Sequence, residues 1–252
     1  MRNRFSLILL RSWLPVLLLV LWWFSSRESD SLYFPSLSVI LETLRTDWLG
    51  THFMTDLVPS LVKLIIGFFA SAILGVLLGT LLGLNRRARA LVEYIILFFR
   101  SLPPPVLVPI GIVLVGVGAS MNIFIVILGA IWPTLMGTID GVRSLDLVRR
   151  DMARSYRLTL GQRLVHIILP NAGPQIFAGM RTTLQLSIIL VVVAEMLAST
   201  NGVGYYVLAS QQTFNVAETW AGTLLLGILG YLSSLLFISA ERRVLRWQVV
   251  SE

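Results

Sequence analysis

Cysteine is absent from the 252-residue sequence, and histidine occurs only as His52 and His166. The absence of cysteine excludes disulfide bonds and thiolate metal sites, and it leaves the redox compartment open. Two histidines so far apart do not indicate a metal site either. Lysine occurs only as Lys63, and the G-x-x-x-x-G-K-[ST] phosphate-binding motif is missing, so the sequence shows no nucleotide site of its own.

Charged residues are also scarce. They make up 13% of the chain, whereas a soluble domain of this length carries about 25%. Hydrophobic residues account for 56% of the chain, and the mean hydropathy is +0.83. Stretches such as 61–84 and 123–136 have almost no charge, which is typical of membrane-spanning helices. The sequence therefore predicts an all-α integral membrane protein.

Six membrane-spanning helices are expected in a single domain that covers residues 1–252. Their ranges are roughly 8–26, 57–84, 91–117, 120–140, 171–198 and 219–240. The first range follows a basic start and could be a signal peptide. However, no small-x-small cleavage motif follows it, and Trp22 and Trp23 are typical of an interfacial aromatic belt. We therefore favour an uncleaved first helix.

The net charge of +7 reflects topology rather than nucleic-acid binding, because the arginines lie in short loops between apolar spans. Fifteen arginines fall at the N-terminus, in the 85–90 and 141–170 loops and in the C-terminal tail. The opposite side carries only Arg27 and Arg45. Since basic residues concentrate in cytoplasmic loops, both termini and the 141–170 loop are expected to face the cytoplasm.

Two features inside the spans bear on packing and on a pathway. In the second span a small residue recurs at every fourth position: Gly67, Ser71, Gly75, Gly79 and Gly83. This smooth face could pack within one chain or against a second copy. In the third span, residues 103–105 are all proline and cannot continue a regular helix. Irregular backbone at membrane depth needs protein or a wet cavity around it, which points to a solute pathway.

Residues 141–170 are predicted to form two short cytoplasmic helices with a bend near 157–159. An apolar stripe runs along one side of the first helix, formed by Leu145, Val148, Met152 and Tyr156. Arginines occupy another side, namely Arg150, Arg154 and Arg157. Thr159 and Gln162 match a capping box that would start the second helix, and Pro170 is expected to end it.

Two interpretations of this segment are open. An amphipathic element lying on anionic lipid would explain its charge and periodicity. A docking element for a cytosolic partner would also explain why a helix, a bend and a second helix are held between two spans.

Residues 151–170, DMARSYRLTLGQRLVHIILP, resemble the cytoplasmic signature loop of bacterial binding-protein-dependent ABC importer permeases, which is called the EAA loop. The family pattern is Glu-Ala-Ala-x-x-x-Gly, followed further on by Ile-x-Leu-Pro. The positions that match it are Ala153, Ile167, Leu169 and Pro170. Asp151 and Met152 stand in for the glutamate and the first alanine, and Arg157 replaces the glycine. A large side chain at that bend could shift the angle between the two helices.

Three more segments are similar to the nitrate, sulfonate and taurine permeases: FPSLSVI (34–40), FRSLPPPVLVPI (99–110) and VAEMLASTNGVGYYV (193–207). The run 152–156 is most like aliphatic sulfonate permeases. The resemblance implies a type I importer permease fold in the bacterial inner membrane, with a substrate such as a sulfonate, taurine or nitrate. The sequence does not identify which solute is carried.

The implied partners are a second copy of the chain, two cytosolic ABC ATPases, a periplasmic or lipid-tethered binding protein, and membrane lipid. The chain itself would hold no cofactor and would not be an enzyme, because ATP and Mg²⁺ belong to the ATPases. The residues implied in ATPase coupling are Leu145, Val148, Arg150, Asp151, Met152, Ala153, Arg154, Tyr156, Arg157, Leu158 and Gly161.

Four ionisable residues fall within or beside the predicted spans, where such groups usually face protein or water. Lys63 is expected to snorkel to the periplasmic interface. Arg100 could pair with Glu93 or act in a gate. Arg181 and Glu195 lie fourteen residues apart on one helix and cannot pair with each other, and Glu195 could anchor the following loop or contact solute. The candidate pathway or gate residues are Arg100, Pro103, Pro104, Arg181 and Glu195.

Two other functions were weighed. A stand-alone secondary transporter ought to show an internal repeat, and none is convincing. A membrane enzyme would need a cluster of carboxylates or histidines at one membrane face, and the sequence shows no such cluster.

Overall fold

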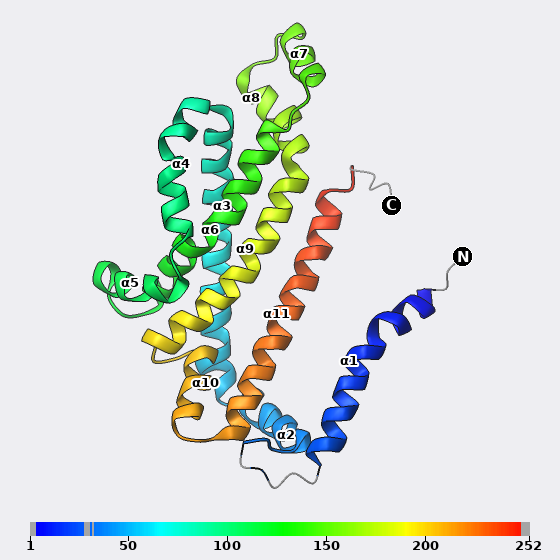
Figure 1. Cartoon of the computed structure of the whole chain (residues 1–252), viewed down its shortest axis with the longest axis vertical. Coiled ribbons are helices and arrows are strands. Elements are labelled where there is room, and N and C mark those ends of the chain that lie inside the picture. Colours follow the sequence, from blue (N-terminus) through cyan, green and yellow to red (C-terminus); the bar gives the residue numbers. More distant parts are fainter. Residues whose placement is uncertain (1–3, 28–30, 32, 248–252) are drawn as a thin grey trace.

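A computed structural model describes residues 4–27, 31 and 33–247, with the side chains of residues 4–12, 15, 150 and 154 outside that description. The described residues form helices and connecting turns and contain no strand, so the prediction of an all-α chain is confirmed. The helices of Figure 1 are α1 (Arg4–Ser26), α2 (Leu37–Trp48), α3 (Val58–Leu84), α4 (Arg86–Arg100), α5 (Leu107–Val115), α6 (Ala119–Arg143), α7 (Leu147–Ser155), α8 (Leu160–Arg163), α9 (Leu169–Ala198), α10 (Val203–Gln212) and α11 (Val216–Val244).

Four helical stretches are long and apolar enough to cross a membrane: Phe53–Leu84, Ala119–Arg143, Leu160–Ala198 and Val216–Val244. The pair formed by Arg86–Arg100 and Pro104–Val115 counts as a fifth crossing if it is one bent span. The described apolar part of α1, Val16–Ser26, is shorter than a full crossing. The count of six spans and their ranges therefore stay predictions.

The core is formed where α6 packs between α3 and α9. The small residues of α3 face α6, and a Cβ atom added at the glycines would lie within 3.0 Å of an α6 side chain. The glycine–partner pairs are Gly67 with Val126, Gly75 with Thr134, Gly79 with Thr138, and Gly83 with Val142. The smooth face predicted for the second span is thus used for packing within the chain.

The same close approach joins α6 to α9. A Cβ atom at Gly137 would lie 2.5 Å from the carbonyl oxygen of Gln175, and one at Gly179 would lie 2.5 Å from that of Pro133. The hydroxyls of Thr134 and Thr183 are 2.8 Å apart in this interface. The helices α3, α6 and α9 are therefore packed tightly against one another.

The third predicted span, 91–117, is not one straight helix. It starts earlier, at Arg86, and breaks between α4 and α5 with a bend of 94°. A short 3-10 turn, Pro104–Val106, follows the extended Pro103 and leads into α5. The break falls at the prolines because each one lacks the N–H that would continue the helical hydrogen bonds.

The second cytoplasmic helix continues directly into the fifth span. Leu160–Ala198 is a continuous helical stretch of 39 residues, so the prediction that Pro170 ends the second helix is wrong. A π-helical turn, Leu164–Ile168, precedes the proline, which lies near the start of α9. Such a wider turn changes the hydrogen-bond register before a residue that has no N–H to donate. The predicted capping box of Thr159 and Gln162 is present.

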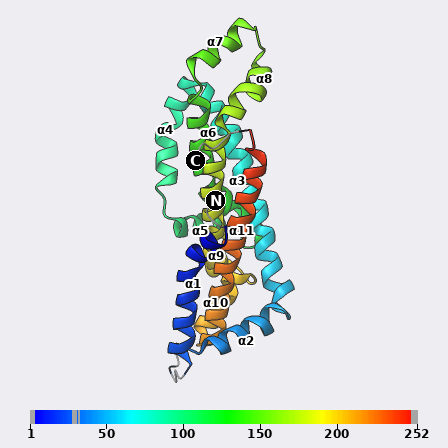
Figure 2. The same cartoon turned by 90° about the vertical axis from the view of Figure 1, so that its right-hand side faces the viewer.

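Two short helices outside the predicted spans close one end of the molecule. In Figure 1, α2 and α10 lie at the end opposite α7, and Figure 2 shows α7 and α8 projecting beyond the bundle at the other end. α1 stands apart from the bundle over much of its length (Figure 1). Its end is held where the ring of Trp22 packs against Trp220 of α11 and Phe34.

Candidate functional site

A cavity of about 480 Å³ opens beside the break between α4 and α5. It is bounded by the end of α4 and the proline segment on one side and by α6 and α9 on the other. The lining residues are Phe99, Arg100, Leu102, Pro104, Leu107, Gly129, Trp132, Pro133, Met136, Thr182 and Leu186. The break in the helix thus leaves an open hollow between α4, α6 and α9.

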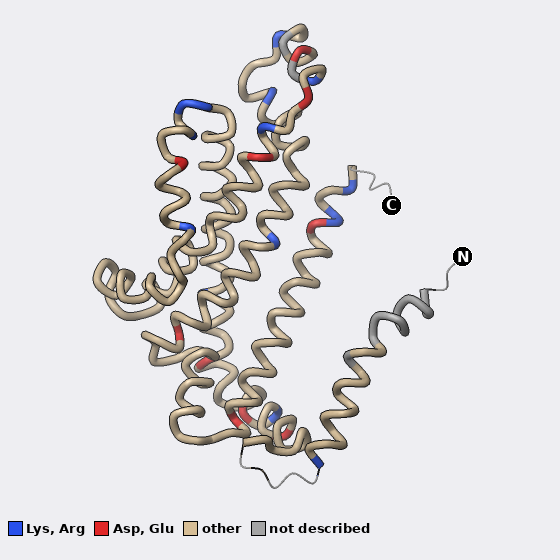
Figure 3. Tube along the Cα trace, viewed as in Figure 1, with Lys and Arg blue, Asp and Glu red and all other residues tan. Residues whose placement is uncertain are grey.

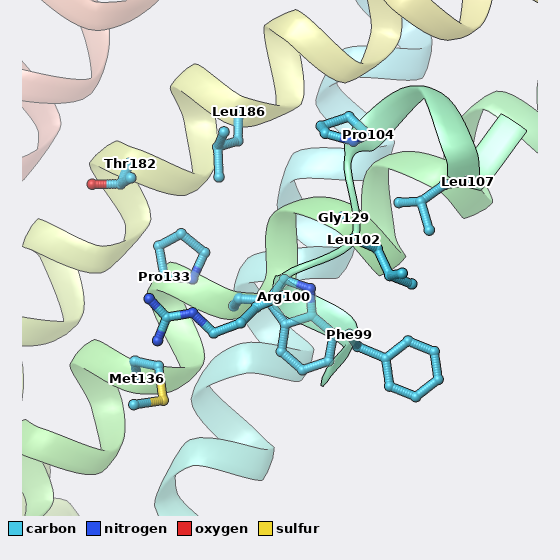
Figure 4. A pocket seen from close by; sticks show the side chains of 11 residues that line it. Phe99, Arg100, Leu102, Pro104, Leu107, Gly129, Pro133, Met136, Thr182 and Leu186 are labelled. Atoms are coloured by element: carbon cyan, nitrogen blue, oxygen red, sulfur yellow. The ribbon is translucent and has the colours of Figure 1, made fainter. Parts of the chain in front are cut away.

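Most of this lining is apolar, and its polar side chains include two hydrogen-bond donors and a hydroxyl that already donates to the carbonyl of Ala178. Among the described residues of the lining, Arg100 carries the only formal charge, and Thr182 and Trp132 contribute a hydroxyl and an indole N–H. In Figure 4 the guanidinium of Arg100 extends toward Pro133 and Met136 of α6. The ring of Trp132 is stacked on Phe99, at a centroid distance of 6.3 Å.

Arg100 has no carboxylate partner within ion-pairing distance among the residues that the structure describes. The pairing with Glu93, one of the two alternatives for Arg100, is therefore not formed. Arg100 and Met136 also line a second cavity of about 350 Å³, which lies toward the end of the molecule that carries α7. Its other charged residues are Arg89, Glu93, Asp140 and Arg143.

Lys63 and Glu195 form a buried ion pair between α3 and α9. The Nζ atom of Lys63 lies 2.9 Å from Oε1 of Glu195, and Ser60 donates its hydroxyl to the same carboxylate. Glu195 is completely buried and Lys63 is 3% exposed. The expectation that Lys63 snorkels to the interface is wrong, because a buried partner lies one helix away.

The same group of side chains holds the start of α10. The backbone N–H groups of Gly202, Val203 and Gly204 donate to Asp56, Ser60 and Glu195, at distances of 2.8, 2.9 and 3.0 Å. Gly202 has a φ of 119°, and an added Cβ atom would lie 2.3 Å from Cδ of Glu195. These contacts favour the interpretation of Glu195 as an anchor for the loop that follows α9.

Beside this anchor, the hydroxyl of Tyr206 donates to Asp47 of α2. Burial, and then the neighbouring Asp47 carboxylate, raise the pKa of Tyr206 well above its usual value. Tyr206 therefore stays a neutral donor at physiological pH, and α10 is tied to α2 as well as to α3 and α9.

The predicted coupling residues lie on α7 and in the turn that follows it, except Leu145, which precedes the helix, and Gly161, which lies on α8; α7 projects from the bundle (Figure 2). Val148, Met152 and Tyr156 expose 73%, 45% and 75% of their surface. Leu145 and Leu158 are half-buried, and Asp151, Arg157 and Gly161 are exposed. Ala153 is 3% exposed, and its side chain faces its own chain. The side chains of Arg150 and Arg154 lie outside the described residues.

Arg157 takes the backbone conformation that the family glycine would supply. Its φ is 51°, in the left-handed region. The N–H of Leu158 reaches back to the carbonyl of Ala153 at 3.1 Å, which closes the end of α7. The bend is thus kept despite the large side chain. Arg149 also donates to Asn171 at 2.7 Å and so ties α7 to the start of α9.

Arg181 and Glu195, both proposed for the pathway, do not line the cavity at Arg100. Arg181 is bonded to Glu241 of α11. The cavity does include Arg100 and Pro104 but not Pro103. Trp132 and Thr182 were missed, because nothing in the sequence distinguishes them from ordinary residues of a span.

The side chains that anchor the start of α10 were only partly identified from the sequence. Asp56, Ser60 and Lys63 recur at i, i+4 and i+7, which places three polar side chains on one face of an apolar helix. That spacing was a usable signal. Within the described part of the chain, no group of three or more His, Asp or Glu side chains is placed to hold a metal ion.

Comparison with known proteins gives consistent results. The profile of the family described as binding-protein-dependent transport system inner membrane component matches residues 71–248. The taurine transport system permease protein TauC of Escherichia coli (strain K12) is 29% identical over 93% of this chain and 87% of its own length. The bicarbonate transport system permease protein CmpB of Synechococcus elongatus is 30% identical over 75% and 68%. The putative aliphatic sulfonates transport permease protein SsuC of Bacillus subtilis is 28% identical over 85% and 78%.

Among solved structures, a chain of the MetNI methionine ABC transporter in an inward-facing conformation superposes with a TM-score of 0.65. The match covers 84% of this chain and 98% of that one, at 20% sequence identity. At this identity the likeness establishes the fold.

Proposed function

Because the chain belongs to the family of inner membrane components of binding-protein-dependent transport systems, we propose that two copies of it form the translocation pathway of an ATP-driven importer. Two cytosolic ABC ATPases dock on α7 and the turn that follows it, and an external binding protein delivers the solute. The ATPases bind ATP and Mg²⁺, and this chain converts their closure into opening of the pathway.

The orientation follows from charge. Basic residues gather at the end that carries α7 and the α3–α4 turn, as Figure 3 shows. We place this end, with both termini, in the cytoplasm according to the positive-inside rule. The end with α2 and α10 then faces the binding protein.

The observation that carries the proposal is the rigid connection from α7 to the bundle. Exposed apolar side chains on α7 offer a surface that a partner can bury, and Arg149 links α7 to the start of α9. The stretch Leu160–Ala198 then runs without a break for 39 residues, or about 58 Å. A displacement of α7 and α8 would therefore move α9 beside the cavity.

The relatives named above transport taurine, bicarbonate and aliphatic sulfonates, according to their names. We infer that the solute here is a small anion or zwitterion with an oxyanion group. Its identity is set mainly by the binding protein.

The double variant Met152→Asp with Tyr156→Asp tests the docking role. Each apolar side chain contributes roughly 1.5–3 kcal/mol when a partner buries it fully, whereas an exposed ion pair contributes about 0–1 kcal/mol. We expect the variant to insert in the membrane but to lose solute-stimulated ATP hydrolysis and to retain the ATPase poorly on purification. The control Met152→Leu with Tyr156→Phe keeps the apolar surface and should behave like the unaltered protein.

An element that only lies on lipid gives a different result. In that case the ATPase copurifies normally with the aspartate double variant and transport persists, and the docking proposal is wrong.

A further inference from the structure

We propose that the cavity at the α4–α5 break is an anion site in the solute pathway, and that Arg100 selects for the oxyanion group of the solute. This inference rests on the proposed function, since it assigns a substrate class to the pathway of that importer. Its chemistry covers sulfonate, carboxylate and nitrate groups, which share negatively charged oxygens.

The depth of Arg100 is the first observation. It is the last of the 15 residues of α4, so it lies about 21 Å along the helix from Arg86 at the cytoplasmic end. An arginine at that depth is costly in lipid and needs a wet cavity, a protein partner or a bound anion. No described carboxylate supplies an ion pair, and the exposed side chain of Arg100 lines the cavity instead.

The character of the lining is the second observation. The Arg100 guanidinium and the Trp132 indole N–H can donate hydrogen bonds, and no carboxylate lines the cavity among the residues that the structure describes. Hydrogen bonds from an arginine to an oxyanion are stronger than neutral ones. The apolar walls lower the local dielectric constant and strengthen the attraction further. A cation would meet only repulsion from Arg100 there.

The third observation is that Arg100 stands where two cavities meet. The second cavity contains three arginines, counting Arg100, but also Glu93 and Asp140. Two carboxylates beside the route reduce the net attraction on the cytoplasmic side. An anion held by Arg100 can therefore leave, as transport requires a site that does not hold its ion tightly.

A phospholipid phosphate has the same chemistry as a solute oxyanion, and the depth of Arg100 favours the solute. Headgroups lie at the membrane surface, whereas Arg100 lies about 21 Å along α4 from the basic cytoplasmic turn. The test below separates the two sources by changing the lipid.

The absence of cysteine makes a direct experiment possible. Met136 lines both cavities, so Met136→Cys places a single thiol beside Arg100. The full chain, with its ATPases if they copurify, is placed in lipid nanodiscs. It is then labelled with 2-sulfonatoethyl methanethiosulfonate, an anion, or with the trimethylammonium-ethyl analogue, a cation. Mass spectrometry of this chain gives the two rates.

The rate of the anionic reagent divided by the rate of the cationic reagent should be higher with Arg100 present than with Arg100 replaced by a neutral residue. Arg100→Gln should lower the ratio of the two rates by about tenfold, the effect of one nearby charge at intermediate dielectric, and Arg100→Lys should restore most of it. Arg181→Gln is the matched control, because Arg181 is bonded to Glu241 and lines neither cavity. It should leave the ratio unchanged within a factor of about two.

The proposal is overturned if Arg100→Gln leaves the ratio unchanged, or if Arg181→Gln lowers it equally. It is also overturned if replacing phosphatidylcholine by phosphatidylglycerol lowers the ratio more with Arg100 present than in the Arg100→Gln variant, since lipid phosphate then occupies Arg100. The negative surface potential of phosphatidylglycerol acts on both proteins alike. Methanesulfonate, with chloride as control, should lower the ratio in the protein with Arg100, because it neutralises that charge, and an unchanged ratio overturns the proposal. If the unaltered chain does not bind an ATPase, but the ratio of the two rates still depends on Arg100, the importer assignment is contradicted and the anion site is not.

Discussion

Lys63 of α3 and Glu195 of α9 meet across 132 positions of sequence in an ion pair of 2.9 Å with almost no access to solvent. The Glu195 carboxylate also accepts from Ser60 and from the N–H of Gly204. A buried charge pair is tolerated when its remaining hydrogen-bonding capacity is used in this way. The pair therefore fixes three helices at the end of the molecule that faces the binding protein in the proposed orientation.

Lys63→Met should destabilise the protein strongly, because it leaves a buried carboxylate without its counter-charge. Breaking a buried pair from one side costs about 3–5 kcal/mol. Thermal unfolding of the purified protein in detergent should show a midpoint lower by roughly 5–15 °C. The double variant Lys63→Met with Glu195→Gln should recover part of the loss. A single variant as stable as the unaltered protein would contradict the proposed anchor.

Gly202→Ala should also be destabilising, for steric reasons. Its φ of 119° is unfavourable for alanine, and the new methyl group would collide with the Glu195 carboxylate. Strain and overpacking together are expected to cost at least about 2 kcal/mol. Gly227→Ala on α11 is the control, because no atom lies within 4 Å of its added Cβ. Equal unfolding midpoints for the two variants would show that the α10 start is not rigidly held.

Arg157→Gly should stabilise the bend after α7. A non-glycine residue with a φ of 51° is strained by about 1–2 kcal/mol, and glycine removes that strain at an entropic cost of roughly 0.5–1 kcal/mol. Arg157→Ile, which is branched at Cβ, should have the opposite effect. Hydrogen exchange of the α7 amides measures both changes. Faster exchange in the glycine variant would indicate that the arginine side chain itself holds the bend.

Gly79→Leu should prevent α3 from packing on α6, because even a Cβ atom there lies 2.6 Å from the Cβ of Thr138. We expect loss of the folded chain rather than only loss of a dimer. Gly230→Leu, at a position with no atom within 4 Å of the added Cβ, is the control. Folded monomers of the Gly79 variant, separated by size-exclusion chromatography, would instead place this face between subunits.

Accessibility of single cysteines checks the orientation. Ser155→Cys at the end of α7 and Gln212→Cys at the end of α10 are exposed positions at opposite ends of the molecule. In intact cells, an impermeant maleimide should label only the second, and inside-out vesicles should reverse the pattern. Labelling of residue 155 from outside the cell would invert the proposed topology.

Patterns in short stretches of the sequence predicted much of the secondary structure, because hydropathy and helical periodicity depend on residues within a few helical turns. The apolar runs placed the long helices, the prolines at 103–105 placed the break, and Thr159 with Gln162 placed the start of α8. Each of these features depends on groups that lie within a few residues of one another.

The contacts between helices depended on tertiary structure, because they are set by which faces meet. From the sequence alone, the glycine face of α3 could pack within the chain or against a second copy. In the structure this face packs against α6. The sequence placed Lys63 at the membrane interface because its partner, Glu195, lies on another helix. It placed a helix end at Pro170, whereas a π-helical turn before the proline keeps the helix continuous. By itself the sequence determined a helical membrane protein with a projecting basic segment. Only the packing of α4, α6 and α9 decided that Arg100 lies beside a cavity with no carboxylate partner among the described residues, since a charge in a span is paired or free according to what the neighbouring helices present to it.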